Sequence, residues 1–255
     1  MTKLIILGIN RSGTKLASLI AAKACGFRFV CLEPFRWEGG IDTKIGTSWQ
    51  EQLARRAPSK KGIDEHRRLP VFPNENSNSK WLENILTKQG WDLVKFIQIG
   101  RARLYHKICP SALILAIIRE PVALFTSLNG STIQKFDVAN QWQRLKVETN
   151  YKDPLPDAED FLPNDLADCA RAYFTLYNHL TSALPKNSIR VSFEKLKSDY
   201  KWLDELGDKL NIKINKNISI PKIGVSTKTP LEAEQSKYIS EKLTPIYHLF
   251  CKQSD

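Results

Sequence analysis

The sequence of 255 residues has no long hydrophobic run. Its longest uninterrupted apolar stretch is residues 112–118, whereas a transmembrane helix needs roughly 18 or more. Too few apolar residues precede Gly8 for a signal peptide. With 42% hydrophobic and 25% charged residues, the composition is that of a globular protein and excludes the disordered and collagenous classes. We therefore expect a folded cytoplasmic protein without a membrane span.

Cysteines are also few, and they form no recognisable pattern. Their number is odd, and none belongs to a C-x-x-C motif or a Cys/His cluster: Cys25, Cys31, Cys109, Cys169 and Cys251. Such spacing favours neither a disulfide framework nor a zinc site. A chain of this length buries enough surface to fold without either, so we expect reduced, mostly buried thiols and no structural metal.

Acidic residues are too few to balance the basic ones. The chain has 38 Lys and Arg against 27 Asp and Glu, a net charge of +11. This excess implies an anionic partner, but charge alone leaves nucleic acid, a membrane surface and a phosphorylated small molecule open. The basic stretch at 55–68 is more typical of a solvated loop than of a binding surface.

Apolar runs alternate with helical patterns along most of the chain. Strands are expected at 3–7, 27–32, 93–99, 113–118 and 188–193, and helices at 14–24, from 121, from 165 to about 184, at 194–210 and at 231–250, where Pro245 should kink or interrupt the last one. Near-continuous apolar strands separated by helices indicate a parallel sheet covered on both faces. The sequence predicts one α/β domain over 1–255, in three layers.

Two stretches break this alternation, at about 35–89 and 129–163. In an open α/β sheet, such excursions tend to cover the carboxyl ends of the strands, where ligands bind. We expect them to form the walls of a substrate site.

A glycine-rich segment, GINRSGTK at residues 8–15, follows the first strand and begins the first helix. Backbone N–H groups and the helix dipole should converge there on an anion. Gly8 and Gly13 have the spacing of the Walker A pattern, but Thr14 stands where its lysine belongs and Lys15 where its magnesium-binding hydroxyl belongs. The segment predicts a phosphate-binding loop that lacks the two most specific side chains of a nucleotide triphosphatase.

Arg11-Ser12-Gly13-Thr14 after a strand resembles the 5′-phosphosulfate loop of the sulfotransferases that use 3′-phosphoadenosine 5′-phosphosulfate (PAPS). In that family, an arginine at a strand end and a serine eight positions later hold the 3′-phosphate, and Arg119 and Ser127 have this spacing. The likeness runs from about residue 3 to 210, is closest in style to carbohydrate, Golgi-type and bacterial members, and is absent from the two excursions. In the stretch at 190–196, RVSFEKL, Phe193 and Lys195 depart from the family pattern.

Two further residues extend the resemblance. Lys95 lies in the strand before that of Arg119, and Glu33 in Leu-Glu-Pro-Phe ends the second strand, as a lysine and a glutamate do in several members. The resemblance implies the P-loop NTPase-like sulfotransferase fold. It also implies that Glu33, Lys95 and Arg11 are catalytic, and that the donor is bound by Arg11, Ser12, Gly13, Thr14, Lys15, Arg119 and Ser127.

The implied reaction is in-line transfer of a sulfuryl group from PAPS to a hydroxyl or amine, with adenosine 3′,5′-bisphosphate as product and no metal. Glu33 would be the general base, with His106 as the alternative. The acceptor, a small molecule or a carbohydrate, stays open, as does the oligomeric state. A P-loop kinase or NTPase shares the fold but needs a lysine and a magnesium ligand that this sequence lacks at those positions. A basic nucleic-acid-binding protein is the third alternative, for which no recognisable motif appears, so we expect no nucleic-acid partner.

Overall fold

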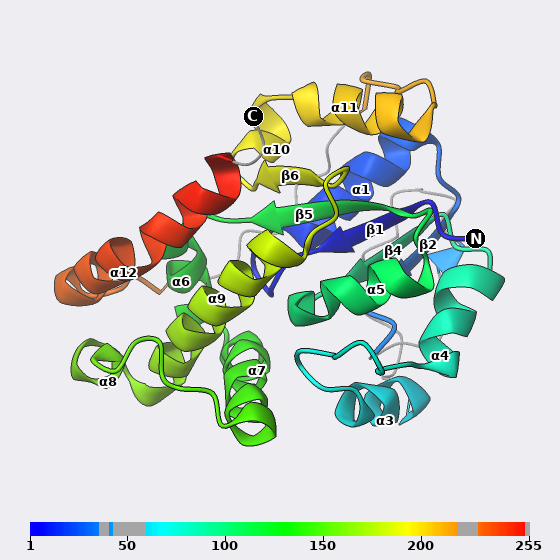
Figure 1. Ribbon diagram of the computed structural model, residues 1–255. Helices are drawn as coiled ribbons and strands as arrows, with labels where there is room; N and C mark the ends of the chain where they lie inside the picture. Colours follow the sequence, from blue (N-terminus) through cyan, green and yellow to red (C-terminus); the bar gives the residue numbers. More distant parts are fainter. Residues whose placement is uncertain (36–40, 43–59, 219–228, 253–255) are drawn as a thin grey trace.

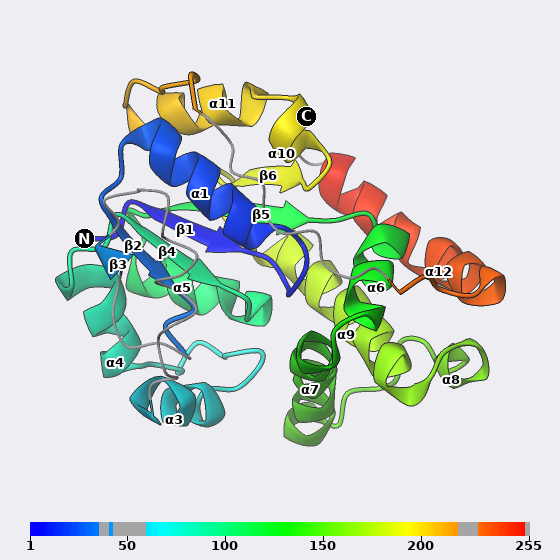
Figure 2. The same ribbon diagram turned by 180° about the vertical axis from the view of Figure 1, so that it is seen from behind.

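A central β-sheet organises the molecule, whose computed structural model describes residues 1–35, 41–42, 60–218 and 229–252 (Figures 1 and 2). The strand order is β3-β2-β4-β1-β5-β6. All neighbouring strands are parallel except β3, which pairs antiparallel with β2 at one edge. The strands are β1 (Leu4–Leu7), β2 (Phe29–Leu32), β3 (Ile41–Asp42), β4 (Leu93–Phe96), β5 (Leu113–Ile118) and β6 (Ile189–Ser192).

Helices cover both faces of this sheet, so the predicted three-layer α/β architecture is confirmed. One face carries α1 (Thr14–Cys25), α10 (Lys195–Ser198) and α11 (Lys201–Leu210) (Figure 1). The other carries α4 (Lys80–Glu83), the π-helical turn η1 (Asn84–Lys88), the 3-10 turn η2 (Ile99–Arg101), α5 (Ala102–Ile108), α6 (Pro121–Asn129), α7 (Thr132–Thr149), α9 (Asn164–Ala183) and α12 (Ala233–Lys252). Two short peripheral helices are α3 (Lys60–Arg68) and α8 (Ala158–Phe161).

The buried strands explain this layering. In β5, every residue is buried, and successive side chains alternate between the two hydrophobic cores. Leu115 and Ile117 face the α1 side, whereas Ile114 and Ala116 face the α9 side. A strand buried on both faces needs an apolar side chain at every position, which is why it appears in the sequence as a continuous run.

Local signals set the helix ends near the sheet edge. Gly26 adopts a left-handed φ of 67° and donates its N–H to the carbonyls of Ala22 and Lys23, which ends α1. Pro121 occupies the first turn of α6, as expected, and the Glu120 carboxylate accepts from the next two free N–H groups. Gly26 thus fixes where α1 ends before β2, and Glu120 fixes where the loop after β5 meets α6.

Three expectations about helices need correction. The predicted helix 194–210 is two helices, because Asp199 leaves the helical conformation and its carboxylate accepts from the N–H of Lys201. Helix α12 runs unbroken through Pro245. The excursion at 129–163 contains the 18-residue helix α7, whose apolar side chains pack on α9. Of the other excursion, 35–89, residues 36–40 and 43–59 lie outside the described residues.

The loops after β1 and β5 meet at the carboxyl edge of the sheet. From β1 the chain passes through α1 to β2 on one side, whereas from β5 it goes on to β6 on the other. Ligands of open α/β sheets bind at such a switch point. No helix of the described residues is long and apolar enough to cross a membrane.

Candidate functional site

The segment between β1 and α1 forms a tight loop. The Ser12 N–H and hydroxyl both donate to the carbonyl of Ile9, at 3.2 Å and 2.7 Å. A Cβ at Gly8 would lie 2.5 Å from Ser12 Oγ. At Gly13, whose φ is +92°, it would lie 2.2 Å from the Phe193 ring. Only glycine fits either position, so the loop is a close-packed cradle of the kind that places backbone N–H groups around an anion.

Arg11 connects this loop to the loop after β5. Its Nε donates to Ser127 Oγ at 2.7 Å, and Arg119 Nη1 donates to the Arg11 carbonyl at 3.1 Å. The residues that the resemblance assigns to the 5′-phosphosulfate and to the 3′-phosphate therefore touch one another. They form one continuous cationic surface across β1 and β5.

The Arg119 guanidinium is only partly satisfied by the described residues. It lies over the Phe193 ring, 4.6 Å from the centroid, and its Nε is buried with no hydrogen-bond partner among them. Burial lowers the pKa of Arg119, and the nearby Glu194 carboxylate opposes that shift. Phe193, a departure from the family pattern, packs on both Gly13 and Arg119, a role that the sequence analysis missed.

Lys95 and Glu33 form an ion pair at the ends of β4 and β2. The Lys95 side chain is 4% exposed and that of Glu33 19%. The Glu33 N–H also donates to the Lys95 carbonyl at 2.9 Å, which continues the β2–β4 pairing by one residue. The pairing of Ile6 with Lys95 places this pair beside β1.

Lys15 belongs to the same charged group. Burial lowers its pKa, and the positive charges of Lys95 and Arg11 lower it further, whereas the Glu33 carboxylate raises it. Four charged residues, from the β1–α1 segment, the end of β2 and β4, are thus within electrostatic reach of one another. The predicted site residues Arg11, Lys15, Glu33 and Lys95 are brought together, in contact with Arg119 and Ser127 through Arg11.

Backbone conformation singles out two of these residues. Among the described non-glycine residues, φ is positive only at Arg11 (68°), Glu33 (55°), Asn150 and Asn211. The two asparagines end α7 and α11, where this residue tolerates the left-handed region. Arg11 and Glu33 neither end a helix nor belong to a residue type that tolerates the left-handed region. Strained backbone tends to concentrate at functional sites. The sequence offered no signal for this feature.

Helix α7 contributes a contact that the sequence analysis also missed. Asn10 Nδ2 of the phosphate loop donates to Asp137 Oδ2 at 2.9 Å. Behind the loops, Tyr177 and Tyr173 of α9 donate their hydroxyls to the carbonyls of Ile117 and Arg119. Helices α7 and α9 therefore hold both loops from the same side of the sheet.

His106, the alternative base, is not brought into this group. It lies near the end of α5, three residues before Cys109, whose thiol donates to the carbonyl of Thr2 just ahead of β1. Because Thr2 precedes β1, this end of α5 is at the amino edge of the sheet. Glu33 follows β2 at the carboxyl edge, so the two candidate bases lie at opposite edges of the sheet.

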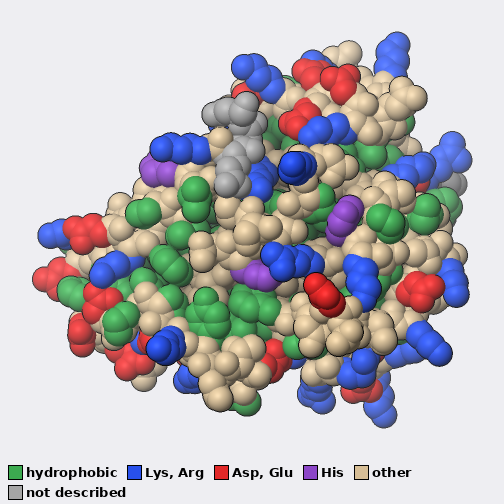
Figure 3. Space-filling model, in the orientation of Figure 1, with side chains coloured by type: hydrophobic (Ala, Val, Ile, Leu, Met, Phe, Trp, Pro, Cys, Tyr) green, Lys and Arg blue, Asp and Glu red, His purple; other side chains and the backbone are tan. Residues whose placement is uncertain are grey.

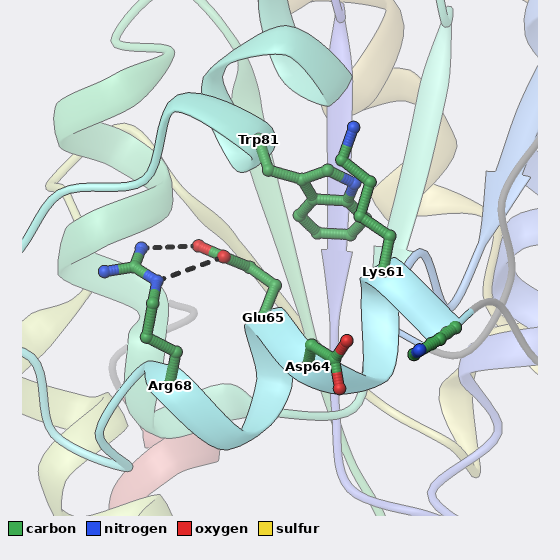
Figure 4. A pocket seen from close by; sticks show the side chains of 6 residues that line it. Lys61, Asp64, Glu65, Arg68 and Trp81 are labelled. Carbon is green, nitrogen blue, oxygen red and sulfur yellow. Dashed lines mark hydrogen bonds and ion pairs between the residues drawn. The ribbon is translucent and has the colours of Figure 1, made fainter.

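A pocket of about 400 Å³ lies between α3 and α4, near Glu33 (Figure 4). A Cβ at Gly62 would lie 2.4 Å from the Pro34 carbonyl, so α3 rests on the residue after Glu33. The Glu65 carboxylate turns toward Arg68 (Figure 4). The pocket mixes cations, carboxylates and an indole: Lys60, Lys61, Asp64, Glu65, Arg68 and Trp81. The described part of the basic stretch at 55–68 is therefore a helix whose charges are partly paired.

Charged side chains of both signs lie on the face seen in Figure 3. There, Lys and Arg side chains are dispersed and interleaved with Asp and Glu. In the described residues no group of three or more His, Cys, Asp and Glu side chains is arranged to hold a metal ion.

Comparisons with known proteins add a likeness of shape. No protein-family model matches the chain, and no curated protein matches its sequence. The structure is similar to a sulfotransferase from Alicyclobacillus acidocaldarius, with 10% identity and a TM-score of 0.47, over 100% of this chain and 96% of that one. It is also similar to the sulfotransferase domain from the curacin biosynthetic pathway, with 14% identity and a TM-score of 0.39, over 95% and 97%. Because these identities and scores are low, the function proposed below rests on the residues of the site.

Proposed function

We propose that the protein transfers a sulfuryl group from PAPS to a hydroxyl or amine of a small-molecule or carbohydrate acceptor. The observation that carries the proposal is the meeting of two groups at one sheet edge. One is the cationic surface of Arg11, Arg119 and Ser127, and the other is the Lys95–Glu33 pair. PAPS has a 3′-phosphate at one end and a 5′-phosphosulfate at the other. Its transfer reaction needs cations for both phosphates and an acid–base pair near the sulfuryl group.

The residues fit this donor in two respects. Gly8 and Gly13 let the loop pack closely against Ser12 and Phe193, in a conformation of the kind that turns backbone N–H groups toward a 5′-phosphosulfate. The buried Arg119 Nε has no partner among the described residues and could donate to a 3′-phosphate, assisted by Ser127. When bound, PAPS would supply a sulfuryl group activated by its anhydride link to the 5′-phosphate.

The chain's own residues then have distinct tasks. Arg11, Lys15 and the loop amides hold the phosphosulfate and stabilise the negative charge that develops on the leaving phosphate. Lys95 places its buried ammonium next to the oxygens of the sulfuryl group that is transferred. Its ion pair with Glu33 also orients that carboxylate.

Glu33 takes the proton of the acceptor hydroxyl as that oxygen bonds to sulfur, while the electron pair of the broken S–O bond stays with the leaving phosphate. A lysine ammonium has three N–H donors, so Lys95 can retain Glu33 while it also donates to the donor's oxygens. The cations perform the charge stabilisation, and the proposal therefore includes no metal.

Ligand selectivity tests the proposal. Calorimetry should show that adenosine 3′,5′-bisphosphate binds at least tenfold more tightly than AMP or ATP, because AMP leaves Arg119 unpaired and ATP has no 3′-phosphate. Transfer of labelled sulfate from PAPS to a panel of sugars and small hydroxyl or amine compounds should proceed in EDTA.

Three results would contradict the proposal. Equal affinity for ATP, or a strict magnesium requirement, would favour a P-loop kinase or NTPase. RNA or DNA binding with a steep salt dependence and no selectivity for adenosine 3′,5′-bisphosphate would favour a nucleic-acid-binding protein.

A further inference from the structure

Two large apolar side chains are exposed near the start of α7. Ile133 is 73% exposed and Phe136 67%. They are three residues apart, so they are neighbours on the helix surface. Large hydrophobic side chains that gather on a surface commonly mark a contact site.

The position of Asp137 places this apolar pair beside the phosphate loop. Asp137 lies one turn after Ile133, so these two side chains are neighbours on the surface of α7, and Phe136 lies on the other flank of Ile133. Asn10 of the phosphate loop donates to the Asp137 carboxylate at 2.9 Å. Helix α7 also begins soon after α6, which carries Ser127. The pair therefore borders the site at the carboxyl edge of the sheet.

The opposite side of α7 packs into the core of the protein. Val138, Trp142 and Leu145 are buried in the core against α9. Ile133 and Phe136 are not part of that packing, and the charged neighbour Lys135 is turned to Asp165 of α9 through an ion pair of 2.6 Å. The packing of the helix does not explain the apolar character of its exposed side.

We propose that Ile133 and Phe136 bind an apolar part of the acceptor. On this assignment, which rests on the proposed sulfuryl transfer, the acceptor is an amphiphilic small molecule. Its hydroxyl or amine reaches Glu33, and its alkyl or aryl body lies on α7. Ligand sites are mostly apolar, with a few polar groups that orient the ligand, and α7 supplies the apolar part that Glu33, Lys95 and Arg11 do not.

Val147 provides a matched control. It is on the same helix and 80% exposed. It lies 11 residues beyond Phe136, about 16 Å along the helix axis at 1.5 Å per residue. The variant Val147→Ser removes a comparable exposed apolar group without touching the proposed contact.

The probes are methyl, hexyl and octyl β-glucoside, each titrated by calorimetry below its micelle concentration, with and without saturating adenosine 3′,5′-bisphosphate. We expect the affinity of the wild type to rise with chain length. The double variant Ile133→Ser, Phe136→Ser should lose about tenfold in affinity for octyl glucoside, whereas Val147→Ser should not. Circular dichroism checks that each variant is folded.

Absence of chain-length dependence in the wild type, or an equal loss in Val147→Ser, would overturn the inference. So would a wild-type dimer in sedimentation that the double variant converts to monomer, because the pair would then bind a second copy. Failure of the nucleotide to bind would count against the proposed function instead, and the titrations without nucleotide would still measure the apolar contact.

Discussion

At the scale of single residues, Arg11 and Glu33 share an unusual backbone conformation. A left-handed conformation costs a residue other than glycine about 1–3 kcal/mol, and both residues adopt it where their side chains meet partners from other elements, α6 and β4. Arg11 reaches Ser127 and Glu33 reaches Lys95. The strained conformations thus occur at the two residues to which the proposed mechanism assigns charge stabilisation (Arg11) and proton transfer (Glu33).

Glu33→Gln keeps the size of the side chain and removes its basicity. We expect kcat for sulfuryl transfer to fall by about 10²–10⁴, with the affinity for adenosine 3′,5′-bisphosphate nearly unchanged. The lost charge partner of Lys95 should lower the free energy of unfolding by about 1–3 kcal/mol, measured by urea denaturation. Glu83→Gln, at an exposed position on α4, is the control. Unchanged turnover would make Glu33 only a structural partner of Lys95.

Arg119→Ala should have the opposite kinetic effect. It removes a charge-assisted contact to the 3′-phosphate, worth about 1.5–3 kcal/mol. Calorimetry should therefore show adenosine 3′,5′-bisphosphate binding weakened by one to two decades, with a smaller effect on kcat at saturation. Lys186→Ala removes one exposed positive charge before β6, at the other edge of the sheet, and should leave binding unchanged. If both variants bind equally well, Arg119 does not contact the ligand.

At the scale of elements, the loop after β1 depends on glycine at its junction with α1. Gly13 has φ +92° and lies against Phe193, whereas Gly26, at the other end of the same helix, has φ +67° and open space around its Cα. The two glycines therefore share the requirement for a left-handed conformation but differ in space. At Gly13, the position that a Cβ would take is used by the Phe193 ring beside the candidate site, whereas at Gly26 nothing occupies it.

Gly26→Ala should destabilise the protein by about 1–2 kcal/mol, the cost of the left-handed conformation for alanine. Gly13→Ala should cost more in urea denaturation, because the new methyl group must displace the Phe193 ring. It should also weaken adenosine 3′,5′-bisphosphate binding at least tenfold, whereas Gly26→Ala should not. Equal effects of the two variants on binding would show that the close packing against Phe193 is not needed.

At the scale of the whole molecule, His179 of α9 makes folding stability depend on pH. Burial is the main cause that lowers its pKa to about 4, and its ring stacks on Phe72 at 4.1 Å. In the unfolded chain, histidine titrates near 6.5. Between these values the unfolded state binds more protons, so stability is fully present above about pH 6.5 and falls as the pH drops toward 4.

We expect this one group to cost about 2–3 kcal/mol of stability between pH 6.5 and 4, a value reduced for the partial exposure of the ring. Urea denaturation at pH 7, 5.5 and 4.5 should show the loss in the wild type. It should be mostly absent in His179→Gln, which no longer titrates. His248→Gln, at an exposed position on α12, should keep the wild-type slope. A slope that survives in His179→Gln would assign the effect to other groups.

The sequence by itself determined the elements whose causes are local. Continuous apolar runs specified the buried parallel strands, as in β5, and the glycine spacing specified a tight loop between a strand and a helix. Pro121 marked the start of α6 for the same reason, because its preference is a property of its own backbone. Within 129–163, the helical spacing of Val138, Trp142 and Leu145 was also present, and the prolines and polar residues around it obscured α7.

Only the tertiary structure decided which side chains meet. The contacts of the candidate site join residues 62 positions apart for Lys95 and Glu33, 116 for Arg11 and Ser127, and 127 for Asn10 and Asp137. Such partners depend on the strand order β2-β4-β1-β5, in which β4 lies between β2 and β1 although it follows both in the chain. No local pattern contains that order. It follows from burying both faces of the sheet at once, which is a property of the whole chain.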